Sequence, residues 1–265
     1  MFTIVAERIN CTRKMIREAV ERRDAAFIQQ EALKQVAAGA TYLDVNAGAH
    51  PETEAEAMCW LLEQILPVTT LPISLDSPNP RVLEIGLQAL NGRPAMINSI
   101  SLEPGKAERL LPLVQTYGTA VIALCLGESM PATAEERLEF AGRLIDQTRA
   151  VGVPDDHVYI DPLVKCVSAE TDQGAAFLKA IRLIRAAYPD VHFCAGLSNV
   201  SYGLPQRTLL NRAFVTLAVW EGLDGAIIDP TDTGVLAQLY AARAVAGLDE
   251  DCMEYLTAVR EGLIA

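Results

Sequence analysis

Residues 72–97 read PISLDSPNPRVLEIGLQALNGRPAMI, and this stretch decides the fold. The apolar run Pro72–Leu75 predicts a buried strand, and the longer stretch Pro80–Leu90 predicts a helix. A second short apolar run, Ala95–Ile97, predicts the next strand. Short apolar strands that alternate with helices are typical of a parallel sheet covered by helices. The stretch therefore predicts one strand–helix–strand unit of an α/β protein.

The same alternation continues in both directions along the chain. Strands are predicted at Phe2–Ala6, Tyr42–Val45, Pro72–Leu75, Ala95–Ile97, Ala120–Leu124, His157–Ile160, His192–Leu197 and Gly225–Ile228. Helices are predicted at Ala25–Ala38, Glu52–Leu66, Pro80–Leu90, Glu103–Tyr117, Thr133–Val151, Gly174–Tyr188, Leu209–Glu221 and Val235–Ala246. Eight such units in about 250 residues match the count and size of a closed barrel. We predict a single (β/α)8 TIM barrel over residues 1–265, with an extra C-terminal helix at Glu250–Leu263 packed outside it.

The composition excludes several classes of protein. The 265 residues are 51% apolar and 21% charged, which is typical of a globular protein and not of a disordered chain. A net charge of −12 without a basic cluster argues against nucleic acid as the main partner. No apolar run is long enough to span a bilayer, and the N-terminus does not resemble a signal peptide. We expect a cytoplasmic protein that does not act at a membrane.

The cysteines and histidines do not form a metal-binding pattern. The six cysteines are scattered and include no CxxC pair, so we expect reduced thiols and no zinc site. His50, His157 and His192 are expected to be structural. Lys165 follows a predicted strand, where it could act as a Schiff-base lysine, but a surface position is favoured because lysines are mostly exposed.

Polar side chains gather where the predicted strands end, which is where the catalytic residues of a TIM barrel lie. They are mainly carboxylates and carboxamides, and no glycine-rich phosphate-binding loop accompanies them. Such a set offers acceptors for N–H groups and suits a flat, nitrogen-rich heterocycle. Any single member could instead cap the next helix. The set comprises Glu7, Asn10, Asp44, Asn46, Asp76, Asn98, Asp161, Ser198, Asn199 and Asp229.

Six motifs in order along the chain resemble one enzyme family. They are ERIN (7–10), LDVNAG (43–48), LDS (75–77), MINS (96–99), YIDPL (159–163) and GLSNVS (196–201). They resemble the pterin-binding methyltransferases that move a methyl group between tetrahydrofolate and a protein-bound corrinoid, above all the methyltetrahydrofolate:corrinoid/iron–sulfur protein methyltransferases. The folate module of cobalamin-dependent methionine synthase and dihydropteroate synthase are more distant relatives. The resemblance extends to LNRAF (210–214) and GLD (222–224), and so covers nearly the whole chain.

The resemblance implies roles for the polar residues. Asp76, Asn98 and Asp161 would hydrogen-bond the pterin ring, because an ionised carboxylate accepts two N–H groups and an amide both donates and accepts. Asn199 would approach N5 of the pterin and stabilise the charge that changes there during methyl transfer. Arg207 would lie over the ring or near the substrate tail, and a surface position is equally open. The surrounding polar shell would be formed by Glu7, Asn10, Asp44, Asn46 and Ser198.

The resemblance also implies what the protein works with. The small-molecule substrate would be tetrahydrofolate or methyltetrahydrofolate, and this chain would bind no metal. Cobalamin would belong to a separate corrinoid protein, because residues 155–160 lack the final glycine of the corrinoid-binding DxHxxG pattern. The family usually forms homodimers. The direction of methyl transfer stays open, and with it a place in acetyl-CoA synthesis or in a demethylation system.

Two other functions remain open. A dihydropteroate synthase would carry a basic pair after the seventh strand, where this chain has Asn199-Val200-Ser201-Tyr202. It would also carry Arg and His after the eighth strand, where this chain has Asp229-Pro230-Thr231-Asp232. A non-catalytic folate-binding protein would keep the pocket without turnover, and the intact Asn199 loop weighs against it. The residues favour the methyltransferase.

Overall fold

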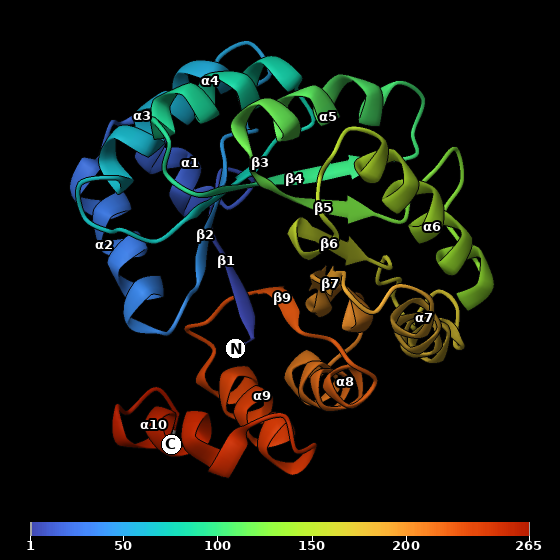
Figure 1. Ribbon diagram of the computed structural model, residues 1–265. Helices are drawn as coiled ribbons and strands as arrows, with labels where there is room; N and C mark the ends of the chain where they lie inside the picture. The colour runs from blue at the N-terminus through green and yellow to red at the C-terminus, as the bar shows by residue number, and fades with distance from the viewer. Residues whose placement is uncertain (1, 265) are drawn as a thin grey trace.

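Parallel strands form a barrel with helices around it in the computed structural model, which describes residues 2–264 (Figure 1). The strands of this part are β1 (Thr3–Asn10), β2 (Tyr42–Asn46), β3 (Ile73–Asp76), β4 (Ala95–Ser101), β5 (Ala120–Leu124), β6 (Val158–Asp161), β7 (His192–Phe193), β8 (Ala195–Gly196) and β9 (Gly225–Ile228). Their order in the sheet is β7-β6-β5-β4-β3-β2-β1-β9-β8. This arrangement confirms the predicted TIM barrel.

The barrel closes through one strand that is split in two. β7 pairs with β6 and β8 pairs with β9, so the two halves join the ends of the sheet. Between them the backbone N–H of Cys194 still donates to the carbonyl of Ile160 in β6. The predicted continuous strand His192–Leu197 is therefore wrong, because the chain changes its partner strand within these residues. Leu197–Ser201 forms a 3₁₀ helix instead of continuing the strand.

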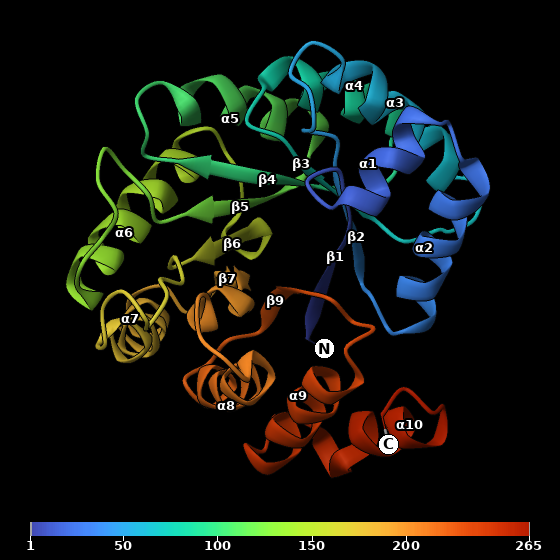
Figure 2. The same cartoon turned by 180° about the vertical axis from the view of Figure 1, so that it is seen from behind.

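Helices surround the barrel on its outer side, and α10 lies beside α9 in both views (Figures 1 and 2). The helices of the described chain are α1 (Lys14–Glu21), α2 (Ala25–Ala37), α3 (Glu54–Ile65), α4 (Pro80–Leu90), α5 (Lys106–Tyr117), α6 (Ala134–Ala150), α7 (Gln173–Ala187), α8 (Arg207–Trp220), α9 (Thr233–Val245) and α10 (Met253–Arg260). No helix within residues 2–264 is long and apolar enough to cross a membrane.

Two helices differ from the prediction. α1 was not predicted from the sequence, although Ile16, Ala19 and Val20 recur at helical spacing and pack against the core. The predicted C-terminal helix Glu250–Leu263 is shorter and begins at Met253. Residues 251 and 252 have φ angles of 53° and 57°, and a helix cannot continue through this left-handed backbone.

The strands also run further than predicted at their C-terminal ends. β1 was expected to stop at Ala6 and continues to Asn10. Asn46, Asp76 and Asp161 are the last residues of their strands and do not follow them as predicted. Polar side chains fit there because the backbone alone makes the ladder hydrogen bonds.

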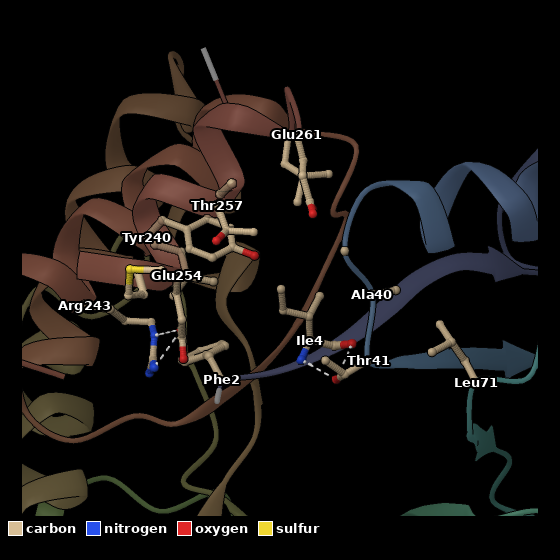
Figure 3. Close-up of a pocket in the computed structure, with 15 residues that line it drawn as sticks. Phe2, Ile4, Ala40, Thr41, Leu71, Tyr240, Arg243, Glu254, Thr257 and Glu261 are labelled. Atoms are coloured by element: carbon tan, nitrogen blue, oxygen red, sulfur yellow. Dashed lines mark hydrogen bonds and ion pairs between the residues drawn. The ribbon is translucent and has the colours of Figure 1, made fainter. Parts of the chain in front are cut away.

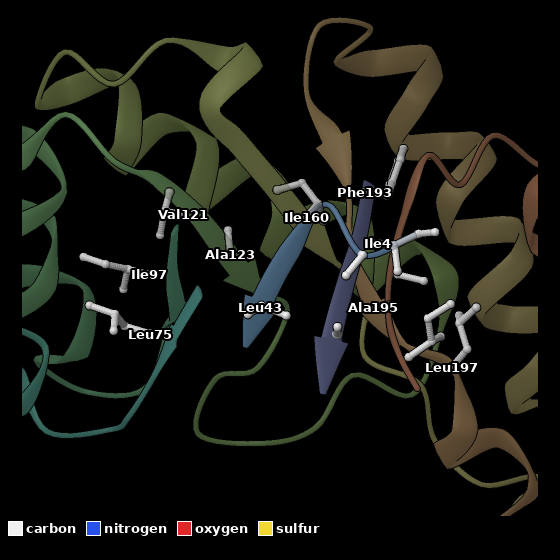
Figure 4. Packing of buried hydrophobic residues seen from close by; sticks show 14 of the residues in the cluster. Ile4, Leu43, Leu75, Ile97, Val121, Ala123, Ile160, Phe193, Ala195 and Leu197 are labelled. Carbon is white, nitrogen blue, oxygen red and sulfur yellow. The ribbon is translucent and has the colours of Figure 1, made fainter. Parts of the chain in front are cut away.

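The two faces of the strands pack in different surroundings. Outward-pointing side chains such as Leu43, Leu75 and Ile97 contact the helices in one large apolar core (Figure 4). A separate buried cluster fills the inside of the barrel and comprises Val5, Met96, Ile122, Tyr159 and Cys194. Because successive side chains of a strand point to opposite faces, the residues two positions after this cluster also point inward.

Candidate functional site

Strand register places four of the predicted site residues in one row. Asn10 of β1 pairs with Asn46 of β2, Asn46 pairs with Asp76 of β3, and Asp76 pairs with Asn98 of β4. Asn98 lies two residues after Met96, which belongs to the cluster inside the barrel. The row therefore faces the barrel interior at the C-terminal ends of four adjacent strands.

Three further carboxylates face the same interior. Glu7 lies two residues after Val5 in β1, and Asp161 lies two residues after Tyr159 in β6. Asp44 of β2 is buried one layer below the row. Register and alternation thus bring together the predicted residues of β1, β2, β3, β4 and β6 at one end of the barrel.

Amide groups hold two of these carboxylates in place. The Nδ2 group of Asn46 donates to Oδ2 of Asp76 at 2.9 Å. The Nδ2 group of Asn98 donates to Oδ1 of Asp44 at 3.3 Å, and the hydroxyl of Ser74 donates to the same oxygen at 2.6 Å. Asn10 differs from them, because its Oδ1 accepts from the backbone N–H of Thr12 in its own turn. The N-cap of α1 is Arg13, so Asn10 does not cap that helix.

Burial raises the pKa of three carboxyl groups in this set. It is the largest cause for Asp44, Asp76 and Asp161, and the charge of Asp76 raises the pKa of Asp44 further. The pKa of Asp161 rises to about 7. None of the three forms an ion pair with a lysine or arginine of residues 2–264. Donors from a ligand would stabilise their ionised forms, since hydrogen bonds to a carboxylate favour its charge.

A buried arginine orders the loop that follows Asp161. The guanidinium of Arg137 is fully buried and donates to the carbonyl of Pro162 at 2.8 Å and to the side chain of Gln173 at 2.8 Å. The backbone N–H of Leu163 donates to Oδ1 of Asp161 at 2.8 Å. Hydrogen bonds from the backbone of Leu163 and Gly196 lower the pKa of Asp161, against the effect of burial. The carboxylate of Asp161 is therefore held by the backbone around it.

Asn199 lies in the 3₁₀ helix Leu197–Ser201, which follows β8 at the same end of the barrel. Its side chain is exposed, and no hydrogen bond within the described residues holds its amide. The alternative that it caps the next segment therefore has no hydrogen bond to support it. Arg207 begins α8 and donates from Nη2 to the carbonyl of Ser198 at 2.7 Å. The guanidinium thus contacts the loop that presents Asn199.

Two arginines at this end were not among the predicted site residues. Arg8 contacts Asp229 at 2.9 Å, and Arg13 lies 3.4 Å from Glu7 and 3.7 Å from Asp229. Burial raises the pKa of Glu7, and the charge of Arg13 opposes this shift. Arg8 belongs to the ERIN motif, and that motif could have identified it as a residue of the site. Arg13 is the N-cap residue of α1, the helix that was not predicted.

The remaining residues singled out from the sequence lie outside this set. His157 is exposed before β6, and His192 hydrogen-bonds Asp224 at 2.8 Å. Lys165 is half-buried and pairs with the exposed Glu170 at 2.7 Å. In the part of the chain that the structure describes, no group of three or more His, Cys, Asp and Glu side chains could hold a metal ion.

A large cavity lies at the opposite end of the barrel. It measures about 640 Å³ and is bounded by the start of β1, the loop before β2, α9 and α10 (Figure 3). Its lining is mainly apolar, with Phe2, Ile4 and Leu71 among the side chains. At the polar end, a cavity of about 70 Å³ lies between Glu7 and Ser198.

Comparisons with known proteins place this geometry in context. The family model described as pterin binding enzyme matches residues 6–229. The chain is 35% identical over 264 residues to the methylcorrinoid:tetrahydrofolate methyltransferase of Eubacterium limosum, with 98% of this chain and 97% of that protein covered. It is 34% identical over 239 residues to the methionine synthase of Mycobacterium tuberculosis, a match that covers 85% of this chain and 20% of that protein.

Solved structures share the fold. A dihydropteroate synthase from Coxiella burnetii, in complex with pteroic acid, superposes with a TM-score of 0.72 at 16% identity and covers 94% of both chains. The 7,8-dihydropteroate synthase of Vibrio fischeri ES114 gives a TM-score of 0.71 at 16% identity over 92% of both chains. At this level of identity the likeness shows a common barrel architecture.

Proposed function

The chain belongs to the pterin-binding enzyme family, and from this premise we propose that it is a methyltransferase acting between N5 of tetrahydrofolate and the cobalt of a separate corrinoid protein. The observation that supports this most strongly is the 35% identity to a methylcorrinoid:tetrahydrofolate methyltransferase over nearly the full length of both proteins. The chain spans one fifth of the methionine synthase that it also resembles, so the similarity to that larger protein concerns its pterin-binding part.

The polar end of the barrel supplies acceptors for the pterin. The 2-amino-4-oxopyrimidine edge of a pterin presents N–H groups, and an ionised Asp161 or Asp76 accepts such groups in pairs. Asn98 both donates and accepts through its amide. Asp44 and Asn46 hold Asn98 and Asp76 in orientation through the hydrogen bonds at 3.3 Å and 2.9 Å. This complementarity between N–H donors and unpaired carboxylates supports a flat heterocycle as the ligand.

Asn199 acts at the reacting nitrogen. When methyltetrahydrofolate donates, the carbon–N5 bond breaks, N5 keeps the electron pair and takes up a proton, and the methyl carbon bonds to cobalt. The reverse direction uses the same atoms. The charge on N5 changes as the methyl group is transferred. A carboxamide whose hydrogen bond to N5 strengthens with this change stabilises the transition state more than the ground state. The exposed, unbound amide of Asn199 is free to turn over such a ring.

The proposal also covers the compartment, the partner and the oligomeric state of the enzyme. The net charge of −12 and the scattered cysteines are consistent with a cytoplasmic protein that binds neither nucleic acid nor membranes. The corrinoid is a substrate carried by the partner protein. We expect a homodimer, as is usual in the family, and size-exclusion chromatography with light scattering measures it.

A methyl-transfer assay with free cobalamin tests the function. Purified protein is mixed with methyltetrahydrofolate and cob(I)alamin, and the absorbance of methylcobalamin is followed; the reverse assay starts from methylcobalamin and tetrahydrofolate. We expect catalysed transfer in at least one direction. Folate binding without transfer would instead indicate a folate-binding protein, and condensation of a pterin pyrophosphate with p-aminobenzoate would indicate a dihydropteroate synthase.

A further inference from the structure

The loop that presents Asn199 is fixed on both sides of that residue. On one side, the carbonyl of Ser198 accepts from Nη2 of Arg207 at 2.7 Å. On the other side, the carbonyl of Val200 accepts from the backbone N–H of Val167 at 3.0 Å. The amide of Asn199 makes no hydrogen bond within residues 2–264. The backbone is therefore held while the amide stays available.

Ser201 is the residue through which α8 holds this loop. It is fully buried, and its hydroxyl donates to Oδ1 of Asn211 at 2.7 Å. The same hydroxyl accepts from Nε of Arg207 at 3.0 Å. Asn211 and Arg207 both lie in α8, so two residues of one helix hydrogen-bond the hydroxyl of Ser201. Asn211 belongs to the LNRAF motif, to which the proposed reaction assigns no role.

Loss of Asn211 would redirect the buried hydroxyl. A buried donor must find an acceptor, because an unsatisfied one costs free energy. The carbonyl of Ser198 lies 3.2 Å from the Ser201 hydroxyl and is the remaining acceptor in reach. That carbonyl already accepts from Arg207. A stronger hydrogen bond from the Ser201 hydroxyl to the Ser198 carbonyl would shift the backbone of the neighbouring residue, Asn199.

We propose that Asn211 is a positioning residue, which sets the place of Asn199 through the hydroxyl of Ser201. The inference rests on the proposed function, because it needs Asn199 to act at N5. Asn211 does not touch the pterin in this account. Its effect passes through Ser201 to the loop backbone, and appears in the rate of methyl transfer and not in the affinity for folate.

A double-mutant cycle with a conservative rescue tests the inference. Asn211→Ala should lower kcat for methyl transfer by about tenfold, the effect of one buried hydrogen bond, with the Kd for methyltetrahydrofolate within about threefold of wild type. Asn211→Asp keeps an acceptor for Ser201 and should restore most of the rate. In an Asn199→Ala background, Asn211→Ala should change kcat by less than about twofold, because its effect passes through the missing amide.

A matched control separates positioning from general loss of stability. Gln238→Ala removes a hydrogen bond of the same length, 2.7 Å, from Nε2 of Gln238 to Thr216, which lies in α8 after Asn211 and does not contact Ser201. It should lower the melting temperature without changing kcat. If Asn211→Ala does not fold, Ser201→Ala removes the same hydrogen bond from the other side and is measured in the same cycle.

The outcomes distinguish this inference from the proposed function. A wild-type protein that transfers no methyl group contradicts the proposed function. An active wild type in which the effects of Asn199→Ala and Asn211→Ala multiply would overturn this inference alone. So would an Asn211→Ala protein with wild-type kcat, or one in which Asn211→Asp is as slow as Asn211→Ala.

Discussion

The two ends of the barrel differ in whether their buried charges form ion pairs. At the C-terminal ends of the strands, Asp44, Asp76 and Asp161 are removed from water without an ion pair to any residue of 2–264. At the other end, the buried guanidinium of Arg243 pairs with Glu254 at 2.9 Å, beside the cavity of about 640 Å³ (Figure 3). The larger space thus lies where charge is already paired.

The difference teaches that carboxylates without a neutralising cation locate this site better than volume does. A desolvated carboxylate without an ion pair destabilises the folded chain, and a ligand with matching N–H donors reduces that penalty. A cavity lined by apolar side chains contains no desolvated charge that the N–H groups of a ligand would stabilise. We therefore propose that the pterin binds at the polar end, and the predictions below test this choice.

The largest effect is expected at Asn199. Replacing it with Ala should lower single-turnover methyl transfer roughly a hundredfold or more, because the loss of one preorganised donor costs about 2.7–4 kcal/mol in well-studied enzymes. The Kd for methyltetrahydrofolate should change less than the rate. Thermal melts run in parallel show whether the variant is folded. A wild-type rate in Asn199→Ala would remove this residue from the mechanism.

The next largest effect concerns folate affinity. Asp161→Ala and Asp76→Ala should each weaken binding of methyltetrahydrofolate by about one to two decades, since a lost charge-assisted hydrogen bond costs on the order of 1.5–3 kcal/mol. The matched control is Glu261→Ala, an exposed carboxylate that lines the cavity at the other end. Calorimetry measures all three. Normal affinity in both folded Asp variants would show that the pocket is misplaced.

A smaller effect follows from pH. The pKa of Asp161 is raised to about 7, so at pH 6 most molecules must lose a proton from this carboxyl group before it accepts two N–H bonds. Folate affinity should fall about tenfold between pH 8 and pH 6, with proton release on binding. The stability of the free protein should move the opposite way. It should fall as pH rises from about 4 to about 7, because the folded state holds a proton that the unfolded chain has lost.

Calorimetry in buffers of different ionisation enthalpy counts the released protons. The comparison variant is Asp161→Asn, which has no carboxyl group to titrate at this position. Its proton release should be reduced and its affinity should depend less on pH. An unchanged proton count in Asp161→Asn would mean that another group is responsible.

The smallest effect is expected at the other end. Thr257 lines the large cavity, and Thr257→Phe places an aromatic ring toward that space. Methyl transfer and folate affinity should stay within about twofold of wild type, because sites without shared contacts act independently. A loss of folate binding in a folded Thr257→Phe protein would reverse the assignment of the two ends.

The sequence predicted the part of the structure that depends on regular patterns. Alternating apolar runs predicted the barrel, and residues at strand ends such as Asp76 and Asn98 were predicted to converge because parallel strands end at one edge. The row follows from register, which aligns Asn46, Asp76 and Asn98 across β2 to β4. Asn10 joins the row after a register shift between Ala6 and Ile9 of β1. The roles of these residues toward a ligand stay predictions.

The remaining features depend on contacts that no local pattern reports. α1 is the exception, because Ile16, Ala19 and Val20 recur at helical spacing and the pattern was available in the sequence. The position of Arg13 beside Glu7 still depends on how that helix packs. The split between β7 and β8 depends on which neighbouring strand each half meets. The contact of Asn211 with Ser201 joins residues ten positions apart through a turn of irregular shape.

The position of the bound pterin tests the central claim most directly. A crystal structure of the protein with methyltetrahydrofolate should show the bicyclic ring among Asp76, Asn98 and Asp161, with its N–H groups within hydrogen-bond distance of the carboxylates. The amide of Asn199 should lie within reach of N5. A ring bound in the cavity between α9 and α10, or one that leaves Asp76 and Asp161 without contact, would contradict the account.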